Sequence, residues 1–302
     1  MRYSSRNSDL KVIRRLLQFL GLITCLLSGF ASTAAPETTP YNITRDLYYG
    51  DVTGPDRDLQ SLDLYWQSKK DKLPVVIYVH GGSWAFGDKA DVHNKPDFFL
   101  SQGIAVISMN YRLRWDYRIF DQAEDVASVI VWVKNNAEIY GLDSNNIILM
   151  GHAAGAHLVS LVATNQSYLK AAGLSLGDIK IVVAIDTVSF DINRLMIELG
   201  SFIERRQHEL IFGSDEEIWR QSSPIHHVSS VKSIPSFAIL YVAQDEATKL
   251  QAMGFAKKLN AAEVEAIMIP GNEKTAQSIN KELGDKGDIP TQALMAFIRA
   301  KI

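Results

Sequence analysis

Residues 149–158, LMGHAAGAHL, have the spacing of a turn that presents a nucleophile between a strand and a helix. In the Gly-x-Ser-x-Gly form of this turn, the serine lies at a sharp apex, and the next backbone N–H stabilises the oxyanion of the reaction. Gly151 and Gly155 occupy the glycine positions, but Ala153 stands at the serine position. The sequence therefore predicts the turn of a nucleophilic active site, with the backbone N–H of Ala154 as an oxyanion donor. The attacking hydroxyl is missing from this turn.

A second glycine-containing segment, YVHGGSWAFGDKAD, lies upstream at residues 78–91. A strand is expected to end at His80, and Gly81 and Gly82 follow it directly. Glycines allow the backbone to approach a ligand and to direct N–H groups toward it, so both are predicted to complete the oxyanion hole. Trp84 is either a substrate-contacting residue or a packing residue. An ordinary glycine turn would explain either motif alone, but the two motifs in this order favour the catalytic interpretation.

The strands that must position these motifs are runs rich in β-branched residues. They are mostly continuous apolar runs, which is typical of parallel strands buried on both faces. The runs cover residues 75–80, 104–110, 146–151, 181–186, 237–243 and 264–270. Residues 59–66 instead alternate between apolar and polar, which predicts an antiparallel edge strand.

Apolar residues at helical spacing lie between the strands, over residues 126–137, 252–259 and 294–298. Strands that alternate with helices predict an α/β fold with a doubly wound, mostly parallel sheet. Residues 187–235 form a long polar interval and are predicted to be a small cap-like excursion. The whole domain is expected to cover residues 46–302.

Together these motifs resemble the α/β-hydrolase superfamily. The resemblance is closest to bacterial esterases and lipases of the carboxylesterase branch that carry a His-Gly-Gly-x-Trp motif, related to kynurenine formamidase-like and feruloyl-esterase-like enzymes. It runs from about Tyr48 to the C-terminus. The matching segments are LDLYW (62–66), HGGSW (80–84), GDK (87–89), NYRL (110–113), GHAAGAH (151–157), SPIHHV (223–228) and SINKELG (278–284).

The resemblance implies a triad of serine, acid and histidine in that chain order. It implies Asp245 as the acid, with Glu246 a weaker candidate, and it places the histidine at position 276, where this chain has alanine. All seven histidines precede Asp245, so the triad cannot be completed elsewhere in this order. We therefore expect no acyl-enzyme turnover from the chain as written.

Two interpretations of the paired alanines remain open. The residues that flank Ala153 and Ala276 match the family pattern, which favours an esterase sequence whose triad has been disabled. The alternative is a natural pseudoenzyme that acts as an exported binding module for a small ester or carboxylic acid. A relocated nucleophile is disfavoured, because Ser83, Ser160 and Ser278 do not lie at the apex of the turn.

The N-terminus has the pattern of an export signal. Residues 1–35 contain a basic leader, a 15-residue apolar run and the small residues ASTAA, whereas a membrane-spanning helix needs about 20 apolar residues. We therefore predict a cleaved signal peptide at 1–35, an extended tether at 36–45, a periplasmic or secreted location and no stable membrane span. The only cysteine, Cys25, lies in the apolar run, so the mature chain would have no disulfide and no thiolate.

The charge and composition also limit the partners. Without residues 1–35 the chain keeps 26 basic and 33 acidic residues, a net charge of −7, which disfavours nucleic acid as a partner. No motif indicates a cofactor, and the spacing of His208, His226 and His227 with carboxylates does not support a metal site. The expected ligand is a small-molecule ester or carboxylic acid.

Overall fold

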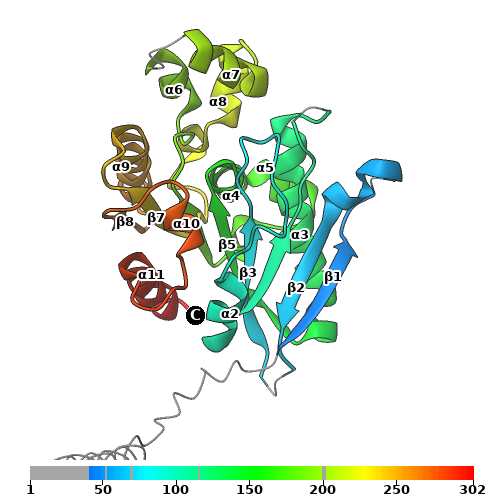
Figure 1. Ribbon diagram of the computed structural model, residues 1–302. Helices are drawn as coiled ribbons and strands as arrows, with labels where there is room; N and C mark the ends of the chain where they lie inside the picture. Colours follow the sequence, from blue (N-terminus) through cyan, green and yellow to red (C-terminus); the bar gives the residue numbers. More distant parts are fainter. Residues whose placement is uncertain (1–40, 52, 69–70, 115, 199–201) are drawn as a thin grey trace, which may run out of the picture. The chain divides into compact units, whose positions relative to one another are not determined.

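The computed structural model describes residues 41–51, 53–68, 71–114, 116–198 and 202–302. The predicted signal peptide and residues 36–40 of the tether lie outside these described residues. The described chain forms one eight-stranded sheet in the order β1-β2-β4-β3-β5-β6-β7-β8, with helices on both faces (Figure 1). Strand β2 runs antiparallel to both of its neighbours, β1 and β4, and the other neighbouring strands pair in parallel. The predicted doubly wound, mostly parallel sheet is confirmed.

The six parallel strands expected from the apolar runs are all present. The runs that form β3 to β7 are largely buried, whereas β8 lies at the edge of the sheet and is only partly buried. The strands are β1 (Asn42–Tyr48), β2 (Ser61–Trp66), β3 (Leu73–Val79), β4 (Ala105–Met109), β5 (Leu142–His152), β6 (Ile181–Ile185), β7 (Ser236–Val242) and β8 (Ala266–Gly271).

The edge of the sheet differs from the prediction. Strand β2 is antiparallel as expected, but β1 pairs with it along Asn42–Tyr48 and forms the edge instead. Residues 42–45, which were expected to belong to the tether, therefore lie in the sheet. The side chains of β1 are mostly exposed, so this strand lacks the apolar pattern that marks the others.

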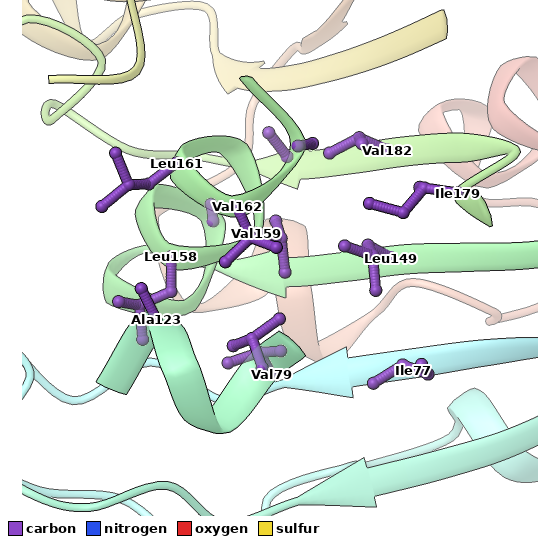
Figure 2. Packing of buried hydrophobic residues seen from close by; sticks show 14 of the residues in the cluster. Ile77, Val79, Ala123, Leu149, Leu158, Val159, Leu161, Val162, Ile179 and Val182 are labelled. Atoms are coloured by element: carbon purple, nitrogen blue, oxygen red, sulfur yellow. The ribbon is translucent and has the colours of Figure 1, made fainter. Parts of the chain in front are cut away.

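Helices cover both faces of the sheet. On one face lie α3 (Ile119–Tyr140), α4 (Ala154–Thr164) and α9 (Glu246–Ala261), and on the other lie α2 (Lys95–Ser101) and α11 (Ile289–Arg299). Figure 2 shows apolar side chains of α4 packed against those of β3, β5 and β6. This packing removes apolar surface from water and fixes α4 over the centre of the sheet. Short helices in the connections include η1 (Gly54–Gln60), α5 (Gln166–Ala171), η2 (Leu176–Asp178) and α10 (Ser278–Lys281).

The described part of the interval 187–235, between β6 and β7, contains several short helices. It contains α6 (Ile192–Glu198), α7 (Phe202–Phe212), α8 (Glu216–Ser222) and η3 (Pro224–His227). The first three helices are grouped at one end of the sheet, at the top of Figure 1. In the part of the chain that the structure describes, no helix has the length and apolar character needed to cross a membrane.

The sheet order places the two glycine motifs beside each other. The chain passes from β3 to β4 on one side and returns to β5 on the other, and the connections that leave such a switch point diverge to form a crevice. Val79 at the end of β3 pairs with Gly151 of β5. The segments that begin at His80 and His152 therefore leave the same edge of the sheet.

Candidate active site

Ala153 lies at the apex of the turn between β5 and α4. Its backbone adopts φ 50° and ψ −109°, a conformation that is uncommon and strained for a residue with a Cβ. The turn is held on both sides: the Ala153 N–H donates to the Ile185 oxygen at 2.9 Å, and its oxygen accepts from the His157 N–H at 3.1 Å. The structure therefore gives the predicted nucleophile position the backbone of a nucleophile elbow.

Gly151 and Gly155 allow this turn to form. A Cβ added to Gly155 would lie 2.1 Å from the Val79 oxygen, and one added to Gly151 would lie 2.3 Å from the backbone of Gly155. The first turn of α4 thus packs directly on the ends of β3 and β5. No other residue type fits either position without displacing backbone atoms.

The Gly81–Gly82 segment faces the same apex. A Cβ built on Gly81 would lie 3.4 Å from the Cβ of Ala153. Gly82 has φ +118°, and its oxygen accepts from two N–H groups that close a turn. Among the described residues, none accepts a hydrogen bond from the N–H of Gly82 or of Ala154. Both groups, the second at the positive end of α4, are available to an oxyanion.

Trp84 connects the oxyanion loop, residues 81–87, to the helices beside it. It is 6% exposed, and its Nε1 donates to Nδ1 of His157 at 3.1 Å. Nε2 of His157 donates to the Ser222 oxygen at 2.7 Å, so the imidazole is neutral, and burial lowers its pKa to about 4. Trp84 also packs edge-on against Phe212 of α7, with ring centroids 5.0 Å apart. Its main role is therefore packing.

A cleft of about 550 Å³ lies between the oxyanion loop and α7. Trp84 is among the residues that line it. The lining residues are Ser83, Trp84, Ala85, Phe86, Arg114, Gln207, His208, Leu210 and Ile211. A pocket of this size with mostly apolar walls is typical of small-molecule sites.

The loop that carries Ala276 contacts the elbow. Nε2 of His152 donates to the Ala276 oxygen at 2.8 Å, and burial lowers the pKa of His152 to about 4. Ala276 itself is exposed and precedes α10. The structure therefore brings the predicted nucleophile and base positions into adjacent segments, although they are more than 120 residues apart in the chain.

Asp245 lies at the N-terminus of α9, where its side chain caps the helix. Its carboxylate accepts hydrogen bonds from the N–H groups of Ala247 and Thr248 at 2.9 and 3.2 Å. The ends of β7 and β8 are joined nearby, where the Ala243 N–H donates to the Gly271 oxygen. The loops that carry Asp245 and Ala276 thus follow neighbouring strands. Glu246, the weaker candidate acid, is exposed and pairs with Lys249 at 3.2 Å.

The structure adds Asp186, which the sequence analysis did not single out. It follows β6 directly, is 5% exposed and accepts from the Val242 N–H at 3.0 Å. Burial, with a smaller contribution from Asp245, raises its pKa. The signal was present, because the apolar run 181–186 ends in this carboxylate. Asp186 holds the end of β7 next to the acid loop.

None of the three other serines considered lies at the apex of the turn. The Ser160 hydroxyl donates to the Ala156 oxygen within α4, and Ser278 Oγ accepts from the Thr275 N–H. Ser83 is exposed in the oxyanion loop. Within the described ranges, no three histidine, cysteine or acidic side chains are grouped so that they could hold a metal ion.

Comparisons with known proteins identify the family of this chain. The BD-FAE family profile matches residues 62–259, more than half of the chain. The probable isoprenylcysteine alpha-carbonyl methylesterase ICMEL2 of Arabidopsis thaliana is 30% identical over 279 residues, which cover 87% of this chain and 64% of that protein. Esterase LipC of Mycobacterium tuberculosis is 28% identical over 266 residues, which cover 78% of this chain and 63% of that protein. This chain therefore spans less than two thirds of the length of both relatives.

Solved structures show the same fold. The crystal structure of inhibited esterase B from Lactobacillus rhamnosis superposes with a TM-score of 0.73 at 21% identity, covering 96% of this chain and 95% of that one. A truncated carbohydrate esterase from gut microbiota has a TM-score of 0.70 at 20% identity, and the match covers 87% of this chain and 97% of that one. The chain belongs to the BD-FAE family and has the esterase-like α/β-hydrolase fold.

Proposed function

We propose that this chain is a carboxylic ester hydrolase scaffold that does not turn over esters as written. The observation that carries the proposal is the strained apex backbone of Ala153, which lies against Gly81 of the predicted oxyanion loop and carries a side chain with no oxygen. Strained backbone conformations of this kind cluster at active sites, so the conformation of residue 153 is expected for a nucleophile and not for an alanine. Ala276, beside the elbow, has no imidazole to accept a proton.

In the intact form, a serine at position 153 would attack the ester carbonyl and pass its proton to a histidine at position 276. Asp245 would orient that histidine, and the N–H groups of the oxyanion hole would stabilise the tetrahedral intermediate. In a protease studied in this way, loss of the nucleophile or the base costs about 10⁶ in kcat. That factor corresponds to about 8 kcal/mol in the barrier. With both groups replaced, no acyl-enzyme can form.

The test is to restore both groups with Ala153→Ser and Ala276→His and to assay short p-nitrophenyl esters. We expect the double variant to exceed the given chain by at least about 10³-fold, because the two groups act as a unit. Each single restoration serves as a control and should remain close to the given chain. A folded double variant with no gain would contradict the proposal, as would labelling of the given chain by a fluorophosphonate probe.

A binding function is the second candidate, supported by the cleft of about 550 Å³ and the unpaired oxyanion donors. Such a pseudoenzyme would hold a small ester or carboxylic acid without cleaving it. Calorimetry of the given chain against aryl and short acyl esters and acids would test this. Tight binding that the doubly restored protein loses would favour the binding module over a disabled esterase.

We also propose that the protein is exported and that residues 1–35 are removed. The proposal is supported by the basic leader, the short apolar run and the small residues before position 36. Expression of the full sequence in a bacterial host, followed by intact-mass measurement, should give a periplasmic or secreted chain that begins near residue 36. A chain with its leader intact in the cytoplasm would contradict export.

A further inference from the structure

The cleft beside the oxyanion loop contains one cation and no described carboxylate. Arg114 lines it together with neutral and apolar residues and His208. The cleft therefore has a positive charge with no negative side chain among its described lining residues. A charge imbalance of this kind in a partly enclosed pocket favours an anionic ligand.

Arg114 is fixed in place by both walls of the cleft. Its backbone N–H donates to the Trp84 oxygen at 2.8 Å, and its Nε donates to the Ile211 oxygen at 3.0 Å. These bonds connect Arg114 to the oxyanion loop on one side and to α7 on the other. No residue in the described part of the chain accepts a hydrogen bond from its two Nη groups.

A guanidinium held through Nε can still present N–H groups to a carboxylate. Arginine donors form a planar fork that matches the two oxygens of a carboxylate, and such charged bonds are stronger than neutral ones. The half-buried position of Arg114 makes this interaction less screened than at an open surface. The Arg114 side chain is thus fixed in position, and its two Nη groups are available to a ligand.

The apolar walls of the cleft require a ligand with an apolar body. Phe86 and Leu210 line it and are 61% and 59% exposed, so a bound chain or ring would cover them. Ala85 and Ile211 extend the same wall. Exposed apolar residues are ordinary when scattered, but a group that lines one cleft favours an apolar ligand.

We propose that this cleft selects esters whose apolar part ends in a carboxylate, and that Arg114 recognises that carboxylate. The inference deepens the proposed function, on which it rests for the place of the ester group beside the oxyanion loop. Monoesters of dicarboxylic acids have this chemistry. Arg114 is then a specificity-determining residue and takes no part in bond cleavage.

Binding to the full chain as given tests the proposal without catalysis. Calorimetry at low salt would compare monomethyl suberate, which has one carboxylate, with neutral dimethyl suberate and cationic methyl 8-aminooctanoate. We expect the monoester to bind at least about tenfold more tightly than the diester, and the amine to bind most weakly. Equal affinities, or no measurable binding of the monoester, would overturn the proposal.

Variants of Arg114 test whether this residue causes the preference for the monoester. Arg114→Gln should remove the preference for the monoester over the diester, whereas Arg114→Lys should keep part of it. Arg118→Gln removes the same charge from a side chain that is 78% exposed, outside the cleft lining, and should retain the full preference. A preference that survives in Arg114→Gln, or disappears equally in Arg118→Gln, would refute the role of Arg114.

Failure of this specificity inference can be distinguished from failure of the proposed function. The doubly restored variant is assayed with p-nitrophenyl acetate, which carries no carboxylate and therefore does not depend on Arg114. Restored hydrolysis without a monoester preference would reject only the specificity inference. A preference that depends on Arg114, without restored hydrolysis, would reject only the catalytic proposal.

Discussion

His152 donates a hydrogen bond from Nε2 to the backbone oxygen of Ala276 at 2.8 Å. The bond links the residue before the nucleophile position to the residue at the base position. A carbonyl can only accept, so Nε2 carries the proton. The pKa of His152, lowered by burial to about 4, keeps the ring neutral near pH 7. His152 thus positions the base loop against the elbow.

In the doubly restored variant, His152→Ala should lower kcat by about 10- to 100-fold with little change in KM. The reason is that a small displacement of the base is costly while the ester cleft is untouched. His152→Gln keeps an N–H donor and should recover part of the loss. Steady-state kinetics on p-nitrophenyl esters measures both. Equal losses in the two variants would show that the hydrogen bond is not the cause.

Gly155→Ala should destabilise the protein by about 3 kcal/mol or more, since the new Cβ would lie 2.1 Å from the Val79 oxygen. Gly254→Ala is the matched control, because it also lies in a helix and its nearest neighbour would be Arg194 at 3.9 Å. The control should gain up to about 1 kcal/mol from better helix propensity. Urea denaturation gives both values. Similar effects of the two changes would contradict the packing argument.

His157 should make stability fall with acid. Burial lowers its folded pKa to about 4 from 6.5, so the unfolded chain binds more protons between these values. Stability is therefore expected to fall as the pH drops from about 6.5 to 4, by up to about 3 kcal/mol from this residue. His157→Gln should reduce this slope in denaturation curves measured across the range. An unchanged slope would mean that His157 is not the titrating group.

Lys95 should also make stability rise with pH, but in a more alkaline range. It is fully buried, and its Nζ donates to the Asn280 oxygen at 2.9 Å; burial, partly opposed by Asp285, lowers its pKa to about 7 from 10.5. Between these values the unfolded chain binds more protons, so the stability contributed at this site rises with pH.

The stability of the parent relative to Lys95→Met should therefore increase by about 3 kcal/mol between pH 7 and pH 10. Methionine is the substitute because it has a similar volume and no charge. Guanidinium denaturation of both proteins at each pH gives the difference. A difference that does not change with pH would show that Lys95 keeps its ordinary pKa in the folded protein.

Local patterns in the sequence predicted the parallel strands and their order along the chain. They also predicted the two glycines that flank the apex of the elbow. Runs that are buried on both faces are apolar without interruption, and the spacing of Gly151 and Gly155 is typical of a tight turn between a strand and a helix. The positions of Ala153 and Ala276 were likewise predicted from motifs in the sequence. That no histidine follows Asp245 is a property of the sequence alone.

The tertiary structure decided which polar residues meet. The contact of His152 with Ala276, the place of Asp186 beside β7 and the anchoring of Arg114 between two walls all join segments that are distant in the chain. Strand β1 was also missed, because its pairing and not its own polar sequence makes it a strand. Hydrophobic periodicity reports which face of an element is buried, but it carries no information about which distant donor reaches which acceptor.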